Sequence, residues 1–365
     1  MSSSSKPKEK ILVAMSGGVD SSVAALHLQE QGISIVGAYM RTWHDDDQHR
    51  PIGQCPWEED LHHARSVAEQ LRIPFSVVNM IEHYRQWVVQ PLIEGYRHGI
   101  TPNPDIFCNQ FIKFGFLADY ARELGCSGIA TGHYCQKITH ADGHCDLLEG
   151  HDPDKDQSYF LAYISQEQLQ FAQFPVGHFL KKEVRTLATR AQLGNASRKD
   201  SQGICFLGKV RIQDFLAHYI PDSPGLIVDT KGRTLGEHSG LHKFTLGQRH
   251  GIRIPSNHDY QHYVVVAKDL ESNHLIVTLE HSSSEKLFQK KITLRNLHFI
   301  HEIIDHPKNL LGKPRYRDPA QKIYFEPTGP TTAVVEFQVP QRALASGQIL
   351  ALYHEKCLLG GGIYV

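Results

Sequence analysis

The pattern of hydrophobic and polar positions between residues 11 and 131 alternates between short apolar runs and amphipathic stretches. Short apolar runs bounded by turn residues predict buried strands, and apolar residues that recur every three or four positions predict helices. Strands are predicted at 11–15, 34–40, 74–80 and 127–131, and helices at 23–32, 57–71, 83–98 and 109–124. This alternation favours a doubly wound α/β domain, in which helices cover both faces of a parallel sheet.

The pattern changes after about residue 150, and strands and turns dominate beyond Pro224. Further helices are predicted at 181–193 and 212–219, and hairpin turns at 229–233 and 270–273. The alternating run 332–339 predicts a strand of a small antiparallel barrel or sandwich. We therefore expect a disordered tail (1–9), a large α/β domain (10–208), a central, mainly β domain (209–283) and a C-terminal domain resembling a β-barrel (284–365).

Composition narrows the class of protein. The chain has 365 residues, of which 41% are hydrophobic and 21% charged, and no apolar run is long enough to span a bilayer. Seven cysteines without a C-x-x-C pair favour a reducing cytoplasm over a disulfide framework. The net charge of −1 requires any nucleic-acid surface to be a local basic cluster. The 24 histidines have no role assigned by the sequence.

The segment SGGVDSS (16–22) predicts a phosphate site, because it joins an apolar strand to a helix through two glycines. A Walker A loop is excluded by the absence of Gly-Lys-Ser/Thr, and the G-x-G-x-x-G spacing of dinucleotide folds is missing. The segment resembles the PP-loop of ATP pyrophosphatases, which cut ATP between its α and β phosphates. Asp20 is a candidate Mg²⁺ ligand, since hard cations prefer carboxylate and phosphate oxygens.

Two cysteines lie in settings that favour reactivity. Cys108 follows TPNPD (101–105), whose prolines predict an extended loop directly before a helix start, and a helix N-terminus favours thiolate. Asp105 is placed three residues earlier as a candidate acid or base. Cys205 lies between two glycines in KDSQGICFLG (199–208). The remaining cysteines are expected to be structural, with Cys126, Cys135 and Cys357 buried and Cys55 and Cys145 in loops.

Seven motifs together resemble one family over most of the chain. They are SGGVDSS, TPNPDIFCN, ATGHY, KDQSYFL, KDSQGICF, GEHSGLHKFTLGQRHGI and CLLGGGI, in this order. In this combination they resemble the bacterial tRNA-specific 2-thiouridylases, a family within the PP-loop superfamily. The resemblance implies adenylation of the wobble uridine O2 of tRNA by ATP, followed by transfer of sulfur to form 2-thiouridine, AMP and pyrophosphate.

The resemblance also implies a role for individual residues. It makes Cys205 the persulfide carrier, Cys108 the nucleophile that forms a transient disulfide with it, and Asp105 the acid or base. It implies nucleotide contacts at Ala14, Met15, Ser16, Gly17, Gly18, Val19, Asp20, Ser21, Met40 and Gly132. It implies tRNA contacts at Asn103, Pro104, Asp105, His133, Lys155, Asp156, Gln157, Arg315, Tyr316 and Gln348.

The implied partners are tRNAs for Lys, Glu and Gln and a sulfur-relay protein fed by a cysteine desulfurase, with no membrane partner. The implied cofactors are ATP and Mg²⁺, with no permanent organic cofactor. Two alternatives remain open. One is a small-molecule PP-loop ligase of the argininosuccinate or GMP synthetase type, which adenylates a metabolite. The other is a non-catalytic RNA-binding or iron–sulfur protein, or a tRNA thiolase that depends on an iron–sulfur cluster. Asp105, Cys108 and Cys205 would then be cluster ligands, although clusters usually have four thiolates at tighter spacing.

Overall fold

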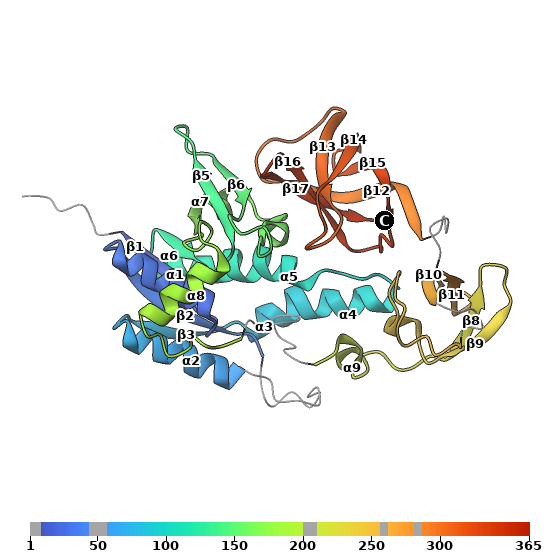
Figure 1. The fold of residues 1–365 in the computed structure, drawn as a ribbon, viewed down its shortest axis with the longest axis horizontal. Coiled ribbons are helices and arrows are strands. Elements are labelled where there is room, and N and C mark those ends of the chain that lie inside the picture. Colours follow the sequence, from blue (N-terminus) through green and yellow to red (C-terminus); the bar gives the residue numbers. More distant parts are fainter. Residues whose placement is uncertain (1–8, 44–56, 200–209, 256–261, 281–286) are drawn as a thin grey trace, which may run out of the picture.

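The computed structural model describes residues 9–43, 57–199, 210–255, 262–280 and 287–365. Cys205 lies outside these ranges, as do Cys55 and residues 1–8 of the predicted tail. The molecule is elongated, with an α/β unit at one end, a β-barrel beside it and a small sheet at the other end (Figure 1). No described helix is long and apolar enough to cross a membrane.

The α/β unit is built on a five-stranded parallel sheet with strand order β3-β2-β1-β4-β7. Its strands are β1 (Lys10–Ala14), β2 (Ser34–Arg41), β3 (Phe75–Asn79), β4 (Gly128–Ala130) and β7 (Ala172–Gln173). Side chains of β1 alternate between two cores: Ile11 and Val13 face one cluster and Leu12 faces the other. This two-sided burial confirms the predicted doubly wound α/β architecture.

Helices cover both faces of this sheet. On the face of Ile11 and Val13 lie α1 (Val19–Glu30), α2 (Trp57–Gln70) and α8 (Lys181–Arg190). On the other face lie two continuous helical runs with π-helical centres. The first is α3 (Ile81–Tyr84), η1 (Arg85–Val89) and α4 (Gln90–Arg97), and the second is α5 (Pro104–Phe107), η2 (Cys108–Phe116) and α6 (Leu117–Glu123).

The second helical run corrects the prediction for the segment before Cys108. The helix begins at Pro104 rather than after Asp105, because proline is tolerated at the first helical position and Asn103 caps the helix. The side-chain oxygen of Asn103 accepts a hydrogen bond from the Ile106 backbone nitrogen (3.4 Å). Cys108 therefore lies beyond the first turn, where the field of the helix N-terminus has largely fallen off.

The central unit is a four-stranded sheet with strand order β10-β11-β8-β9. Its strands are β8 (Gly225–Asp229), β9 (Thr234–His238), β10 (Tyr263–Asp269) and β11 (His274–Leu279). Both hairpin turns lie where the sequence predicts them. The remaining short helices of the described chain are η3 (Ser158–Leu161), α7 (Gln166–Phe171), α9 (Ile212–Leu216) and η4 (Leu241–Lys243).

The C-terminal strands form a barrel, because β12 pairs with both β15 and β17 and so closes the sheet. Its strands are β12 (Phe288–Phe299), β13 (Lys308–Lys313), β14 (Gln321–Gly329), β15 (Thr332–Arg342), β16 (Ile349–His354) and β17 (Cys357–Tyr364). The barrel alternative of the prediction is confirmed.

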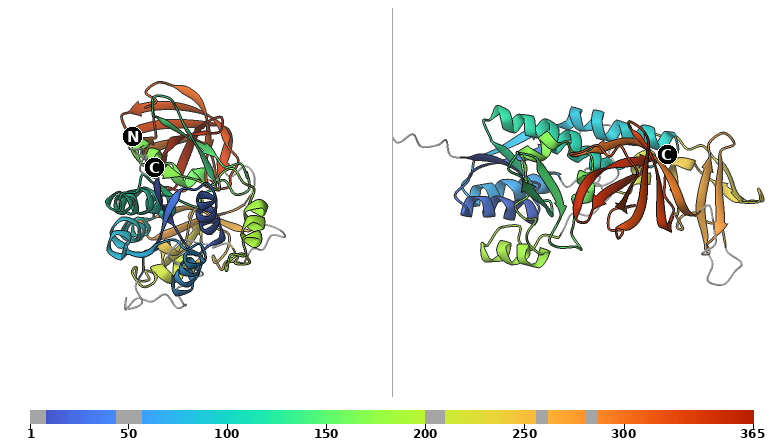
Figure 2. Two further views of the ribbon diagram at one scale, coloured as in Figure 1. Left: turned by 90° about the vertical axis from the view of Figure 1, so that its left-hand side faces the viewer. Right: turned by 90° about the horizontal axis from the view of Figure 1, so that it is seen from above.

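An unpredicted hairpin of the α/β unit joins the barrel sheet. It consists of β5 (Cys135–Thr139) and β6 (Cys145–Glu149), and β6 pairs with β17 through Leu148–Cys357 and Leu147–Leu358. Cys145, expected in a loop, is buried on β6. The two further views show the hairpin projecting from the α/β unit beside the barrel (Figure 2). The α/β unit and the barrel thus share one hydrogen-bonded sheet.

Candidate functional site

The loop after β1 leads straight into α1, as the strand–glycine–helix pattern predicts. The helix begins at Val19, four residues earlier than predicted, with Gly18 in an extended conformation at its N-cap. The hydroxyls of Ser21 and Ser22 both donate to the Gly18 carbonyl (3.1 and 3.0 Å). Ser16 Oγ and Ser21 Oγ lie 3.2 Å apart. The loop therefore presents hydroxyls and a helix N-terminus at one point, an arrangement suited to an anion.

Two residues that follow α8 form hydrogen bonds with the SGGVDSS loop. Asn195 is buried, and its amide donates to the Gly17 carbonyl (2.8 Å) and to Ser22 Oγ (2.9 Å). Arg198 donates to the same Gly17 carbonyl (3.2 Å) and forms an ion pair with Asp60 of α2. Burial raises the pKa of Asp60, and the Arg198 guanidinium opposes that shift. The sequence prediction placed neither Asn195 nor Arg198 at this loop, from which both are distant along the chain.

Gly17→Ala is expected to lose ATP-dependent turnover and stability. Gly17 has φ +78°, and a Cβ atom there would lie 2.2 Å from the Asp60 carbonyl oxygen. Gly32→Ala is the matched control, because Gly32 has φ +77° with open space around its Cβ position. The left-handed conformation alone costs about 1–2 kcal/mol, so thermal melts should show Gly17→Ala to be the more destabilised. Equal melting temperatures and equal activity in the two variants would contradict this assignment.

The loop lies at the point where the strand order reverses. β2 and β3 lie on one side of β1 and β4 lies on the other, and ligands of such sheets bind outside the carboxyl ends at this switch. A Cβ atom on Gly132, just after β4, would lie 2.7 Å from the Ser21 nitrogen. Met40 lies near the carboxyl end of β2 and packs partly buried against the core. The structure thus brings Gly132 against the loop.

Asp20 is engaged by a lysine that the sequence prediction did not single out. Lys181 Nζ donates to both carboxylate oxygens of Asp20 (2.6 and 2.8 Å), and the Tyr134 hydroxyl donates to Oδ1 (2.7 Å). A Mg²⁺ ion at Asp20 would have to replace this ammonium. The one group of metal-ligating side chains found among the described residues lies elsewhere and excludes Asp20. In this arrangement Asp20 does not fit a magnesium ligand, and the cation at its carboxylate is Lys181.

The barrel braces the segment that precedes Cys108. Gln348 Nε2 donates to the Thr101 carbonyl (2.7 Å), and the Thr101 nitrogen donates to the Ser346 carbonyl (2.9 Å). Gln348, implied as a tRNA contact, therefore contacts this segment of the protein. Asp105 is half-buried, whereas Cys108 is buried with 1% of its surface exposed. Any reaction of Cys108 requires the surrounding side chains to move.

His133 is buried beside aromatic rings. Its ring lies 6.0 Å from the Phe114 ring and 6.3 Å from the Phe174 ring, and Nδ1 lies 2.7 Å from Thr131 Oγ1. Burial, together with the nearby Lys113 ammonium, holds the pKa of His133 well below its usual value. His133 is therefore neutral at pH 7 and offers no cation to RNA in this conformation.

Asp156 and Lys313 join the α/β unit to the barrel. Lys313 Nζ donates to Asp156 Oδ2 (2.7 Å) and lies 2.8 Å from Glu149 Oε1. Burial acts to lower the pKa of Lys313, but the two carboxylates outweigh it and raise the pKa. Asp156 also accepts from the Gly150 and Ser158 nitrogens (3.0 and 3.1 Å). Asp156 is thus buried in a domain contact rather than open to tRNA.

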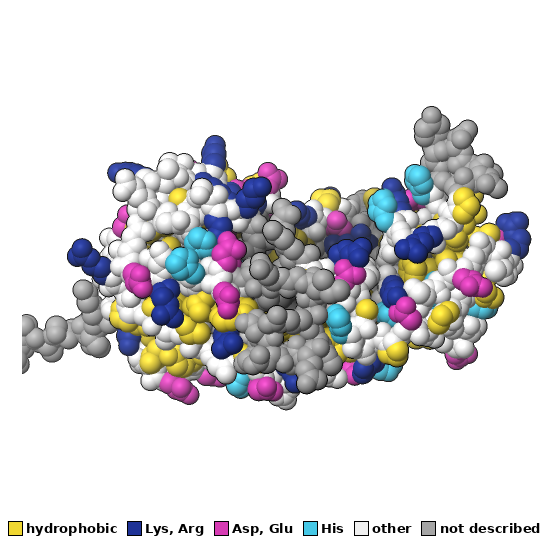
Figure 3. Space-filling view, turned by 90° about the horizontal axis from the view of Figure 1, so that it is seen from below, with side chains coloured by type: hydrophobic (Ala, Val, Ile, Leu, Met, Phe, Trp, Pro, Cys, Tyr) yellow, Lys and Arg dark blue, Asp and Glu magenta, His cyan; other side chains and the backbone are white. Residues whose placement is uncertain are grey.

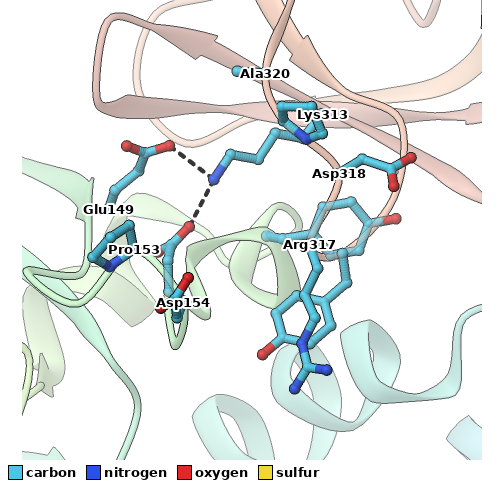
Figure 4. Close-up of a pocket in the computed structure, with 11 residues that line it drawn as sticks. Glu149, Pro153, Asp154, Lys313, Arg317, Asp318 and Ala320 are labelled. Carbon is cyan, nitrogen blue, oxygen red and sulfur yellow. Dashed lines mark hydrogen bonds and ion pairs between the residues drawn. The ribbon is translucent and has the colours of Figure 1, made fainter. Parts of the chain in front are cut away.

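A pocket of 330 Å³ lies over this ion pair. Figure 4 shows Lys313 pointing toward Glu149, while Arg317 extends in another direction.

Arg317 is exposed, and its guanidinium lies 5.2 Å from the Tyr316 ring centroid. The Tyr316 ring itself packs on Phe160 at 4.3 Å. Arg315 donates to the backbone carbonyls of Arg342 and Ala343, so its guanidinium is largely committed within the barrel.

The other implied contacts are distributed along these same elements. Gln157 Oε1 accepts from the Tyr134 nitrogen (3.0 Å), while Lys155 is half-buried. Burial raises the pKa of Tyr159, which a hydrogen bond with the Asn103 side chain opposes. The Tyr159 hydroxyl donates to the Ile349 carbonyl of the barrel (2.8 Å). The TPNPD and KDQSYFL segments and the barrel therefore meet in one region.

Comparison with known families covers nearly the whole chain in three consecutive parts. Residues 9–209 match the tRNA methyl transferase HUP domain, residues 213–279 the tRNA methyl transferase PRC-barrel domain, and residues 289–364 the aminomethyltransferase beta-barrel domain. Among solved structures, a 4-thiouridine synthetase–RNA complex with bound ATP aligns with 53% of this chain and 43% of its own chain. It is 17% identical with a TM-score of 0.34, which is too low to bear on the function.

Curated relatives match at much higher identity. The tRNA-specific 2-thiouridylase MnmA of Akkermansia muciniphila is 46% identical over 355 residues, which cover 97% of this chain and 98% of the relative. The protein of the same name from Streptococcus sanguinis is 42% identical over 363 residues, covering 99% of this chain and 96% of the relative. The resemblance seen in the motifs is thereby confirmed, and the chain belongs to the tRNA-specific 2-thiouridylase family of enzymes.

Proposed function

We propose that the chain catalyses ATP-dependent thiolation of the wobble uridine O2 of tRNA, giving 2-thiouridine, AMP and pyrophosphate. The observation that carries the proposal is the SGGVDSS loop at the β1/β4 switch point, with hydroxyls, a helix N-terminus and the Lys181 ammonium gathered there. Positive groups fixed in advance stabilise the charge that develops when a phosphate bond breaks. Family membership supports tRNA as the molecule that receives the adenylyl group of ATP.

The chemistry divides into two steps. First, uridine O2 attacks the α phosphate of ATP, and the bond to pyrophosphate breaks, which turns a poor leaving group into AMP. Second, the terminal sulfur of a Cys205 persulfide bonds to C2 and AMP leaves. The Cys108 thiolate then attacks the inner sulfur, so that a Cys108–Cys205 disulfide forms and the other sulfur stays on the base. A thiol reductant must reopen the disulfide before the next turnover.

The roles implied by the family stay part of this proposal. Asp105 serves as acid or base on the uracil. The nucleotide contacts remain Ala14 to Ser21, Met40 and Gly132. The proposed tRNA surface keeps Asn103, Pro104, Asp105, His133, Lys155, Asp156, Gln157, Arg315, Tyr316 and Gln348, of which the buried members act by shaping the protein around the base.

The proposed setting follows from the reaction. The partners are tRNAs for Lys, Glu and Gln and a sulfur-relay protein fed by a cysteine desulfurase, and we place the reaction in the cytoplasm, where tRNA and ATP are found. Mg²⁺ remains a prediction without a ligand assigned among the described side chains. The domain limits 10–208, 209–283 and 284–365 likewise stay predictions.

Nucleoside mass spectrometry tests the reaction. Unmodified tRNA incubated with the protein, ATP, Mg²⁺ and a persulfide donor should gain the mass of an oxygen-to-sulfur exchange at the wobble uridine. Release of AMP and pyrophosphate should depend on tRNA. Turnover with a small metabolite in the absence of tRNA would instead establish the ligase alternative. An iron–sulfur absorption spectrum in anaerobically purified protein would establish the cluster alternative.

Of the two arginines that flank Tyr316, Arg317 is the better placed to contact a phosphate, because it is exposed and Arg315 is held by backbone carbonyls. On the face shown in Figure 3, basic and acidic side chains are interspersed over the described surface, in keeping with the near-zero net charge. Affinity for tRNA must then depend on individual cations of this kind.

Arg317→Ala is expected to weaken tRNA binding and reduce the salt slope of the binding constant by about one unit. ATP binding should stay unchanged, because the nucleotide loop lies in the α/β unit. Arg190→Ala, on the exposed end of α8, is the control of equal charge. Titrations across a salt series measure both variants. A slope for Arg317→Ala that matches wild type would remove Arg317 from the RNA surface.

A further inference from the structure

The hairpin of β5 and β6 gathers two histidines and an aspartate on one face. His140 and His144 close the hairpin, and the His140 nitrogen donates to the His144 carbonyl (2.9 Å). Cross-strand neighbours point to the same face of a hairpin, as do residues two apart on one strand. His140, His144 and Asp146 therefore share a face, and their ligand atoms all lie within 4.8 Å of one another.

The side chains around this cluster are already arranged as metal ligands usually are. His144 Nδ1 lies 2.5 Å from Asp142 Oδ1, which leaves Nε2 as the ligating atom. A carboxylate on the second ring nitrogen is the usual outer partner of a metal-bound histidine, because it fixes the tautomer and the ring orientation. His140 Nε2 lies 2.8 Å from Asp146 Oδ2. In a tetrahedral zinc site each ligand atom lies about 2.0–2.1 Å from the ion. The distance between two such ligand atoms is then about half an ångström longer than the present distance between His140 Nε2 and Asp146 Oδ2.

We propose that His140, His144 and Asp146 form a binding site for a divalent transition-metal ion of the zinc class, with Asp142 as the outer partner of His144. Imidazole nitrogen with one carboxylate oxygen suits Zn²⁺, whereas Mg²⁺ and Ca²⁺ prefer oxygen ligands throughout. Side-chain exposures of 39% for His140, 26% for His144 and 31% for Asp146 allow an ion to enter. The proposal is independent of the proposed thiolation reaction.

The position of the site gives it a structural consequence. The rings of His140 and His144 are stacked at 4.1 Å, and His301, which follows β12, stacks on His144 at 4.3 Å. β6 also pairs with β17 of the barrel. An ion on this hairpin would therefore strengthen the junction at which the α/β unit and the barrel share a sheet, with His301 as its neighbour from the barrel side.

Calorimetric titration of Zn²⁺ into the full chain tests the site. The protein is treated with a chelator and carries Cys108→Ser and Cys205→Ser, so that the reactive thiols cannot take the ion. One zinc ion per chain is expected to bind. Replacing both His140 and His144 by alanine should weaken binding at least about a hundredfold, and Asp142→Asn should weaken it about tenfold, as loss of an outer partner does. Mg²⁺ should give no comparable heat.

His306→Ala with His354→Ala is the matched control, because both histidines are exposed in the C-terminal domain and neither belongs to the cluster. This variant should bind zinc as the parent does. Binding that survives intact in the His140/His144 variant places the ion elsewhere and overturns the proposal, as does the absence of zinc binding in the parent. If the double variant fails to fold by circular dichroism, Asp142→Asn decides alone, and unchanged affinity in that variant counts against the site.

Discussion

Replacing Lys181 by methionine is expected to reduce ATP-dependent adenylation by about 10²–10³-fold, the loss typical of removing one fixed group that stabilises developing charge. The ammonium of Lys181 lies 2.6 and 2.8 Å from the two carboxylate oxygens of Asp20. Asp20 itself lies in the first turn of α1, the helix that follows the phosphate loop. Lys181 is therefore a fixed cation beside the loop to which we assign the ATP phosphates. Methionine keeps much of the side-chain length and removes the charge together with its hydrogen bonds to Asp20.

Lys182→Met is the control, since Lys182 is the exposed neighbour on the same helix. Pyrophosphate release in the presence of tRNA measures the first step alone, and tRNA affinity should be unaffected in both variants. The Tyr134 hydroxyl still donates to Asp20 in the Lys181 variant, so the melting temperature should change little. Pyrophosphate release within a few-fold of wild type would show that Lys181 only holds Asp20 in place.

The parallel sheet and the phosphate loop were predictable because their signals are local. The apolar run 11–15 is buried on both faces as β1, and the two glycines after it mark the turn into α1. Helix starts were less accurate. Val19 and Pro104 begin their helices four and five residues before the predicted starts at 23 and 109, because caps at Gly18 and Asn103 extend each helix toward its N-terminus.

Contacts between distant segments were not predictable from patterns. Lys181 stands 161 positions from Asp20, and Asn195 stands 178 positions from Gly17. The pairing of β6 with β17 joins segments that no local period connects. These interactions depend on which surfaces the completed sheets bring together, and a single sequence contains no signal for that.

The resemblance to the family identified residues near the site but did not predict which contacts their side chains make. Asp156 and Gln348 were expected at the tRNA, yet Asp156 pairs with Lys313 and Gln348 donates to the Thr101 carbonyl. Both contacts hold the barrel against segments of the α/β unit. Their replacement would therefore disturb domain packing as well as RNA binding, and binding data on such variants need a stability measurement beside them.

Cys108→Ser is expected to accept labelled sulfur from a persulfide donor but to form 2-thiouridine at least about 10⁴-fold more slowly, as is common when a nucleophile is removed. A hydroxyl cannot form the disulfide that releases sulfur from Cys205. Serine is nearly isosteric with cysteine, so the fold should be retained, at the cost of placing a hydroxyl at a position that is 1% exposed. Cys205→Ser should fail at the earlier point and carry no labelled sulfur.

Cys126→Ser separates these effects from the cost of placing a hydroxyl in the core, because Cys126 is also buried and has no part in the proposed reaction. It should thiolate tRNA at close to the wild-type rate. The burial of Cys108 adds a second expectation: alkylation of this thiol should be slow in the free protein and faster once tRNA and ATP are bound, since the reaction requires its neighbours to move. Normal turnover by Cys108→Ser, or labelled sulfur held by Cys205→Ser at the wild-type level, would reverse the roles assigned to the two cysteines.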